Sequence, residues 1–512
     1  MKKLLIILVV STAAFTSCKK FLEKEPDNRT KLESPEKVSQ LLGSAYPQNN
    51  YQLMAELSSD NADDLITQSL DDPNWLRLTT DIYTFTDNNA GAASEDTPDG
   101  YWFGCYRAIA ACNLALAAID KVPAAAQNDY KAQKGEALLA RAYAHFMLVN
   151  FFSKFYNPAT ASSDPGIPYV TEPEEVSIKK YERKTVQYVY DMIEQDLHQG
   201  LPLIDDNSYR ILKYHFNKTV ANAFASRYYL HKKEMDSVIK YATAAIPENN
   251  FTRYLRPWNT VYIGLDLNGN GSLDQVYNSA TENANLLLAE SQSWWWRISN
   301  FGRYGMSKVL SGYAGGNAHI SDGPWAYRVG AYLTGHNSIP KIEYNFVETS
   351  IGSGIGNEWP RVVLLSAEEV LFNLAEAYTY KGENQKAIDL LNTYLSTRID
   401  GYNASVDNID AEKIESFYQQ NPDLLKATPF SQVNNLTGGL INIILDYKQL
   451  EFSQEGLRWF DILRYGMVVT HNQYKNNGNV IDKTYTLDAN NIHRVFELPA
   501  TAMSQAGLPG NR

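Results

Sequence analysis

The stretch GEALLARAYAHFMLVNFF, residues 135–152, is rich in alanine and carries apolar side chains three and four positions apart. This spacing gathers the apolar side chains along a helix and predicts one here. YWFGCYRAIAACNLALAAID, residues 101–120, has the same character and predicts a second helix. Residues 185–201 predict an amphipathic helix, and Ser34 is expected to cap a helix that follows it.

Two later blocks each predict a pair of helices joined by a turn. Residues 217–246 divide near residues 231–234, and residues 366–398 divide at residues 381–383. The second block resembles tetratricopeptide repeats, in which small residues let paired helices pack closely. Its small and aromatic residues are Ala375, Ala377, Tyr378, Gly382 and Ala387. The sequence therefore predicts a mostly α fold on a tetratricopeptide-like helical-repeat scaffold.

Between these helical blocks, residues 251–360 have no sustained helical period and are rich in glycine, asparagine and aromatic residues. We expect long loops and short strands laid over the helices. Loops held by a rigid scaffold often carry binding residues. This loop-rich region is therefore the expected location of a ligand site.

The N-terminal stretch MKKLLIILVVSTAAFTSC has the layout of an export signal, with two lysines, a short apolar run and then small or polar residues. The apolar run is too short to span a bilayer, which takes about 20 residues. Cleavage before Cys18, with lipid attached to that cysteine, is the preferred interpretation. The alternative is an ordinary secretory signal in which Cys18 is incidental.

Composition limits the remaining function classes. The formal net charge of −12 argues against nucleic acid as a partner, because binding phosphates requires lysine and arginine. No segment after the signal reads as a membrane span. Cys105 and Cys112 lie about two turns, roughly 10 Å, apart on the predicted helix, too far for a disulfide, and are expected in the core.

Several blocks, in this order, resemble the SusD/RagB family of Bacteroidetes outer-membrane lipoproteins. They are CKKFLEKEPDN at residues 18–28, GEALLARAYAHFMLVNFFSKF with the later DPGIPYV, RKTVQYVYDMIEQDL, and ILDYKQLEFSQEGLRWFDILRYG at residues 444–466. The sequence departs from the family where Asp446 and Tyr447 replace the usual Glu-Arg pair and where the lipobox is loose. The predicted division is a signal at 1–17, anchor and tether at 18–33, helical region at 34–250, loop-rich region at 251–360 and C-terminal helical region at 361–512.

The resemblance implies a binding role without catalysis. Members of the family are anchored by lipid, including palmitate, in the outer membrane. They face the cell exterior and capture glycans, or in some cases peptides. They pass these ligands to a SusC-type TonB-dependent transporter barrel. An oligosaccharide is the expected ligand and that barrel the expected protein partner.

The tryptophans of SQSWWWRISN, residues 291–300, are the leading candidates for ligand binding. Whether extended or helical, the segment cannot direct Trp294, Trp295 and Trp296 to one side, so one or two are expected to face the ligand. Sugar rings pack on indole faces, and their hydroxyl groups need polar partners. The further candidates are Arg297, Asn300, Arg303, Trp75 and Trp325.

DLNGNGSLD, residues 266–274, resembles part of an EF-hand calcium loop. Asp266, Asn268, Asn270 and Asp274 occupy its liganding positions 1, 3, 5 and 9, and Gly271 its turn position. Tyr277 stands where the bidentate carboxylate belongs. Calcium is therefore weighed against a polar asparagine-glycine hairpin.

No recognised enzyme motif is present, and no cofactor is expected. The eight histidines show no metal-binding spacing, and no GxSxG serine occurs. In EGLRWFDILRYG we expect Glu455, Arg458, Asp461 and Arg464 to form a ladder of ion pairs on one helix face. A glycosidase needs only two facing carboxylates, so a glycan-degrading enzyme and a protein-docking repeat protein stay as alternatives.

Overall fold

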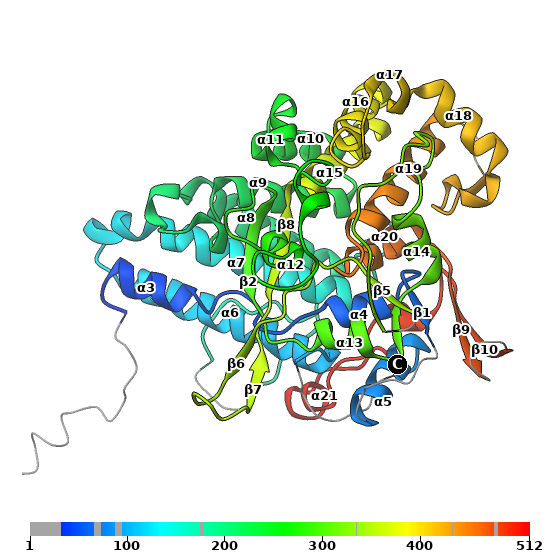
Figure 1. Ribbon diagram of the computed structural model, residues 1–512. Coiled ribbons are helices and arrows are strands. Elements are labelled where there is room, and N and C mark those ends of the chain that lie inside the picture. Colours follow the sequence, from blue (N-terminus) through cyan, green and yellow to red (C-terminus); the bar gives the residue numbers. More distant parts are fainter. Residues whose placement is uncertain are drawn as a thin grey trace, which may run out of the picture.

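The computed structural model describes residues 32–65, 73–87, 95–174, 179–333, 335–432, 435–475 and 480–512. The export signal and Cys18 lie outside these residues. Two groups of helices form most of the structure. In Figure 1, the first group, of residues 98–200, lies toward the left, and the second group, of residues 367–465, lies toward the right. The main helices are α6 (Pro98–Asp120), α7 (Lys131–Phe152), α8 (Val186–Gly200), α9 (Lys218–Lys232), α10 (Met235–Ala245), α15 (Ala367–Tyr380), α16 (Asn384–Leu395), α19 (Leu436–Glu451) and α20 (Leu457–Tyr465).

Helix α7 lies at the centre of the first group, packed between α6 and α8. Every residue of α7 except Lys131 and Lys134 is buried. A Cβ atom on Gly135 would lie 3.0 Å from the carbonyl oxygen of Gly200, so the glycine allows α7 and the end of α8 to touch. The alanine-rich stretch is therefore a core helix, as its composition predicts.

Both predicted helix pairs are confirmed. Helices α9 and α10 are joined at Lys233, which has a left-handed φ of 62°. Helices α15 and α16 are joined through Gly382, with φ of 76°. Ser34 caps α3 (Pro35–Leu42) and accepts from the Lys37 N–H at 3.4 Å. The mostly α, tetratricopeptide-like fold is confirmed.

One described helix, α6, is long and apolar enough to cross a membrane. Most of its apolar window is buried inside the protein, where it packs on α7, so it serves as a core helix. Cys105 and Cys112 lie on α6, both free and buried, as expected.

Within the described residues, five antiparallel strand pairs and several short helices accompany the main helices. The pairs are β1 (Ala62–Asp64) with β3 (Tyr304–Met306), β2 (Asn285–Glu290) with β8 (Arg361–Ser366), β4 (Gly330–Leu333) with β5 (His336–Ser338), β6 (Phe346–Glu348) with β7 (Gly356–Glu358), and β9 (Val469–Lys475) with β10 (Val480–Leu487). The short helices are α4 (Gln52–Leu57), α5 (Pro73–Tyr83), α11 (Phe251–Tyr254), α12 (Leu273–Tyr277), α13 (Trp295–Phe301), α14 (Lys308–Ala314), α17 (Ala404–Asp407), α18 (Ala411–Gln420) and α21 (Ala500–Ala506). Residues 251–360 thus contain short strands as expected, and also short helices that the sequence pattern did not indicate.

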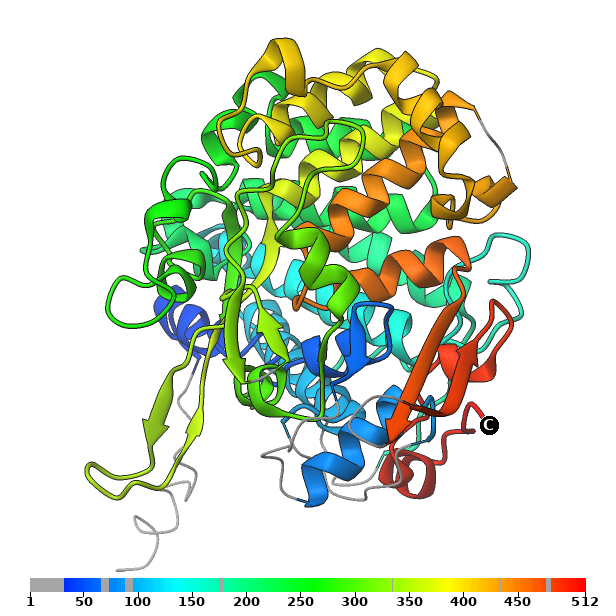
Figure 2. The same cartoon turned by 45° about the vertical axis from the view of Figure 1, so that its right-hand side comes forward.

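The β6–β7 hairpin projects from the body of the protein (Figure 2). Ile351 and Ile355 at its tip are highly exposed. Its base lies beside the tryptophan segment, because the N–H of Ser293 donates to the carbonyl oxygen of Glu358 at 3.1 Å. The hairpin therefore borders the region in which the ligand site is expected.

Candidate ligand-binding site

The three tryptophans are separated by the start of a helix. Trp294 precedes α13, and Trp295 and Trp296 are its first two residues. Trp295 is only 2% exposed, and its Nε1–H donates to the carbonyl oxygen of Gln454 at 2.9 Å. Trp294 and Trp296 are half-buried. One tryptophan therefore fixes the segment to the core, while its two neighbours keep part of their rings at the surface.

Trp296 belongs to a cluster of aromatic rings that was not predicted from the sequence. Its ring centre lies 4.7 Å from that of Tyr344, 5.7 Å from Phe301 and 6.4 Å from Tyr332. Tyr344 is 50% exposed, and Phe301 and Tyr332 are half-buried. We call Trp296, Phe301, Tyr332 and Tyr344 the aromatic cluster. Its members come from α13, β4 and the segment before β6, so only the fold brings them together.

The polar candidates near the tryptophans divide between surface and interior. Arg297 is exposed beside the cluster. Asn300 is buried, and its side-chain oxygen accepts from Ser338 Oγ at 2.7 Å. Arg303 forms a two-point ion pair with Asp64, at 3.0 and 2.7 Å. The expectation that all three face a ligand needs correction, because structural contacts already engage the side chains of Asn300 and Arg303.

The two remaining tryptophan candidates have different surroundings. Trp75 lies on α5 and is half-buried. Trp325 is 6% exposed and packs against Tyr313 and Tyr447, with ring centres 5.8 and 5.5 Å away. The expectation that Trp325 contacts a ligand is wrong, because its ring is enclosed by other aromatic side chains.

The loop of residues 266–274 lies next to the aromatic cluster. Leu267 approaches Gly330 of β4, and the charge of Asp274 contributes to raising the pKa of Tyr332 after burial, the larger cause. Asp266, Asn268 and Asn270 are exposed, whereas Asp274 is half-buried and accepts from Ser272 Oγ. Tyr277 is buried and donates to Glu455 at 2.5 Å. The position of a bidentate calcium ligand is thus held by a core tyrosine, and calcium binding stays a prediction.

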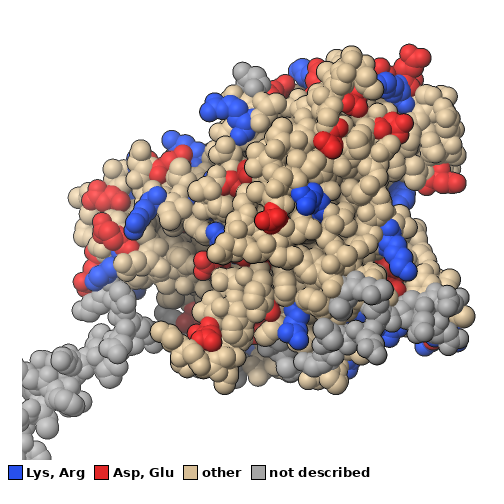
Figure 3. Space-filling view, viewed as in Figure 1, with Lys and Arg blue, Asp and Glu red and all other residues tan. Residues whose placement is uncertain are grey.

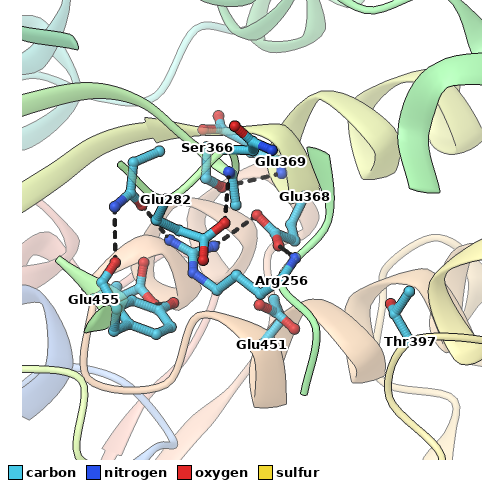
Figure 4. Close-up of polar contacts among 12 residues, drawn as sticks. Arg256, Glu282, Ser366, Glu368, Glu369, Thr397, Glu451 and Glu455 are labelled. Atoms are coloured by element: carbon cyan, nitrogen blue, oxygen red, sulfur yellow. Dashed lines mark hydrogen bonds and ion pairs between the residues drawn. The ribbon is translucent and has the colours of Figure 1, made fainter. Parts of the chain in front are cut away.

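Within the described part of the chain, no group of three or more His, Cys, Asp or Glu side chains is arranged to hold a metal ion. The acidic groups that do gather are buried with cations. Arg256 lies near Glu368, Glu451 and Glu455 between the loop-rich region and the helices (Figure 4). Arg398 Nη2 lies 2.9 Å from Glu368 Oε1 and Arg398 Nε 2.9 Å from Glu451 Oε2, with all three side chains fully buried. This network joins the two regions and is closed to ligands.

The C-terminal signature is also structural, although the predicted ladder is largely wrong. Arg464 pairs with Asp461 at 2.7 Å, the one predicted step that forms. Arg458 pairs instead with Asp60 at 2.8 Å, and Glu455 with Lys341 at 3.1 Å. Glu455 lies before α20 rather than in it, so it cannot follow the helical spacing. The four charges connect distant segments of the fold.

The side chain of Asp96 holds the start of the tryptophan segment. Asp96 is fully buried and accepts from Ser293 Oγ and the Trp294 N–H, both at 2.7 Å. Burial raises the pKa of Asp96 to about 7 despite these two hydrogen bonds. Burial also raises the pKa of Glu358 to about 7, against the opposing charge of Arg297.

On the face seen in Figure 3, acidic and basic side chains are scattered among a larger uncharged area. A groove of about 410 Å³ elsewhere is lined by α6, α21 and residues near Pro168. Its Tyr106 and Asn113 already donate to backbone carbonyl oxygens at 2.8 and 3.0 Å. The aromatic cluster is therefore the stronger candidate for a polar ligand with flat apolar faces.

Two family models match the chain. The model described as "Starch-binding associating with outer membrane" matches residues 20–230, and the model described as "SusD family" matches residues 324–508. No curated protein matches it.

Solved structures share the fold over nearly the whole chain. A putative sugar-binding protein from Bacteroides vulgatus is 18% identical, with a TM-score of 0.64 over 94% of this chain and 99% of that one. A SusD superfamily protein from Bacteroides thetaiotaomicron is 17% identical, with a TM-score of 0.61 over 94% and 100%. A laminarin-binding SusD-like protein is 16% identical, with a TM-score of 0.59 over 94% and 99%. The two family matches, with a fold shared along the chain, show that this protein belongs to the SusD family, as the resemblance predicted.

Proposed function

We propose that the protein binds an oligosaccharide without chemical change and delivers it to a SusC-type TonB-dependent transporter barrel. The observation that carries this proposal is the aromatic cluster at the surface, with Trp294 and Arg297 beside it. Sugar rings present C–H faces that pack on aromatic rings, and a nearby guanidinium can donate to their hydroxyl groups.

The comparisons support this ligand class. One structural neighbour is named as laminarin-binding, and one family model is described as starch-binding. Laminarin and soluble starch are therefore the first probes to use.

A binding role rather than catalysis is proposed because the acids of the C-terminal signature are committed to ion pairs. Lys448 and Arg464 outweigh burial and hold the pKa of Asp461 at about 2. A permanently ionised, paired carboxylate is a poor general acid. Release of reducing sugar from either polysaccharide by the pure protein would overturn this part of the proposal.

We further propose that Cys18 carries the lipid that holds the protein in the outer membrane, facing the exterior. The family model's description supports association with that membrane. Radiolabelled palmitate should enter the full-length protein and not a Cys18→Ala variant. Equal labelling of both would refute lipidation at this cysteine.

The ligand class is tested by affinity electrophoresis of the chain from Lys19 onward through gels containing laminarin or starch. We expect retardation by one of them, and its loss in a Trp296→Ala/Tyr344→Ala variant. Tyr188→Ala is the matched control, because Tyr188 is a 40% exposed tyrosine on α8, away from the cluster. Equal retardation of the cluster variant and wild type would move the site elsewhere, and no retardation by any polysaccharide would favour a peptide ligand.

A further inference from the structure

A polar pocket of about 510 Å³ lies beyond the end of α7 and shares no residue with the aromatic cluster. Its walls come from the segment after α7 near Lys154, the α9–α10 turn at Lys233, the end of α20 at Arg464 and the segment after β10 near Arg494. Pockets of about 300–1,000 Å³ are typical of sites for small molecules. This pocket is therefore large enough for a small organic ligand.

The charged side chains that line this pocket are mostly basic. They are Lys154, Lys233, Arg464 and Arg494, accompanied by Asp164. Asp164 pairs with Lys154 at 2.9 Å, and Arg464 pairs with Glu376 and Asp461 at 2.6 and 2.7 Å. Lys233 is exposed, and neither it nor Arg494 has an ion-pair partner among the described residues. In a chain with a net charge of −12, the pocket therefore keeps two positive charges without a countercharge.

Arg494 is the buried one of these two cations, with 7% of its surface exposed. Its guanidinium is held by backbone carbonyl oxygens: Nε donates to Asp488 at 2.6 Å, Nη1 to Ile462 at 3.1 Å, and Nη2 to Met467 and Leu487. A guanidinium has five N–H donors, so one N–H of Nη1 has no acceptor within the described chain. Burial lowers the pKa of Arg494 to about 10, although the charge of Asp488 opposes this shift. Carbonyl dipoles thus compensate this buried cation less fully than an adjacent negative charge would.

A second arginine with the same kind of support adjoins the pocket wall. Arg183 donates to the carbonyl oxygens of Gly166 and Pro509 at 2.6 and 2.8 Å and to Asn511 Oδ1 at 2.7 Å. Asn511 and the neighbouring Gly510 line the pocket. Arg183 has no ion pair in the part of the chain that the structure describes, and burial lowers its pKa as well. The positive potential of the pocket is therefore reinforced from behind its lining.

We propose that this pocket binds an oxyanion group, either as an inorganic ion or as the acidic group of a sugar. A carboxylate, sulfate or phosphate carries the missing negative charge and accepts several hydrogen bonds, which an arginine N–H and a lysine can donate. Asn157, Thr160 and Asn490 are exposed in the same lining and can bond to the hydroxyl groups of a sugar. The site is separate from the aromatic cluster, so this inference goes beyond the proposed function and does not depend on it.

Calorimetric titration at constant ionic strength tests the ligand class. The protein is the chain from Lys19 onward, which contains every described residue, and the probes are glucuronate, sulfate and glucose. We expect glucuronate to bind and glucose, which lacks the acidic group, not to bind. Sulfate bound as tightly as glucuronate would identify the oxyanion alone as the ligand, whereas weaker binding of sulfate would assign part of the affinity to the sugar hydroxyl groups.

Two substitutions that leave the core untouched test the location. Lys233→Asn removes an exposed charge, and asparagine tolerates the left-handed φ of 62° at this position. It should weaken glucuronate binding about fivefold, the upper end for an exposed pair of charges. Asn490→Asp adds a negative charge to the lining at almost unchanged volume and should weaken binding by a similar factor. Both variants avoid Arg494, whose removal would leave buried carbonyl groups without donors.

Two controls separate this pocket from other cations. Lys121→Asn removes an exposed lysine that also caps a helix, α6, but does not line the pocket, and it should bind as wild type does. The Trp296→Ala/Tyr344→Ala variant should likewise retain its affinity for glucuronate. Loss of that affinity in the cluster variant would place the anion beside Arg297 and overturn the proposal. So would failure of both anions to bind, equal affinity for glucose and glucuronate, or unchanged affinity in both Lys233→Asn and Asn490→Asp.

Discussion

The buried acids of the helical scaffold and those beneath the tryptophan turn are in opposite electrostatic situations. In the scaffold, Glu368 and Glu451 contact Arg398, and Asp461 contacts Lys448 and Arg464. Beneath the turn, the carboxyl group of Asp96 accepts hydrogen bonds from Ser293 and Trp294, and neither Asp96 nor the nearby Glu358 has an ion pair within the described chain. Burial alone raises the pKa of a carboxyl group, and a cation at close range reverses that effect. The nearby cations therefore hold the pKa of Glu451 and Asp461 at about 2, whereas burial raises the pKa of Asp96 and Glu358 to about 7.

The largest effect is expected from removing a cation of the scaffold. Arg398→Met leaves Glu368 and Glu451 buried with less compensation and should lower the free energy of unfolding by about 3–5 kcal/mol. Denaturation in urea measures this change. Arg297→Met, which removes an exposed arginine on the ligand side, should stay within about 0.5 kcal/mol. Equal effects of the two substitutions would remove the distinction between the regions.

Substitutions of two adjacent tryptophans should distinguish an effect on folding stability from an effect on glycan binding. Trp295→Ala removes a buried ring and should cost about 3–5 kcal/mol of folding stability. Trp296→Ala should cost less stability but weaken glycan binding by about 2 kcal/mol, as expected for an aromatic anchor of an interface. Urea denaturation and calorimetric titration measure the two quantities. A Trp296→Ala variant that binds normally would place the ligand outside the aromatic cluster.

Low pH should destabilise the scaffold by protonating Asp461. The pKa of Asp461 is lowered from 3.8 to about 2, so its stabilisation is present above about pH 4 and lost as pH falls toward 2. The loss should approach about 2 kcal/mol in the free energy of unfolding. An Asp461→Asn variant should lack this part of the acid dependence. Asp482→Asn, in an exposed pair with Lys475, is the control and should follow wild type.

Calcium should give the smallest effect. With the Kd of about 10⁻⁴–10⁻³ M that is typical of weak extracellular calcium sites, about 1 mM calcium would stabilise the protein by about 0.4–1.4 kcal/mol. Thermal unfolding with calcium and with chelator measures the difference. Asp266→Asn/Asp274→Asn should abolish it. No shift in wild type would favour the alternative of a plain polar turn.

The helices could be predicted from sequence, whereas the site could be predicted only in part. Local periodicity sufficed for α7 and the helix pairs because neighbouring residues determine it. The aromatic cluster was missed because Tyr332 and Tyr344 join Trp296 only through tertiary structure. Likewise, Arg458 finds its partner at Asp60, far away in sequence, which helical spacing could not indicate. The tryptophan pattern predicted that the three rings would not face one side, but not which ring is enclosed.

Helix α7 has almost no solvent-facing side, since only Lys131 and Lys134 escape burial. Amides in such an element exchange with solvent hydrogen mainly through global opening of the protein. Its deuterium uptake would therefore report the stability of the whole molecule, while amides of the β6–β7 hairpin would report local opening. The exchange rate of the amides in this alanine-rich helix is therefore a reference with which the local opening of less buried segments can be compared.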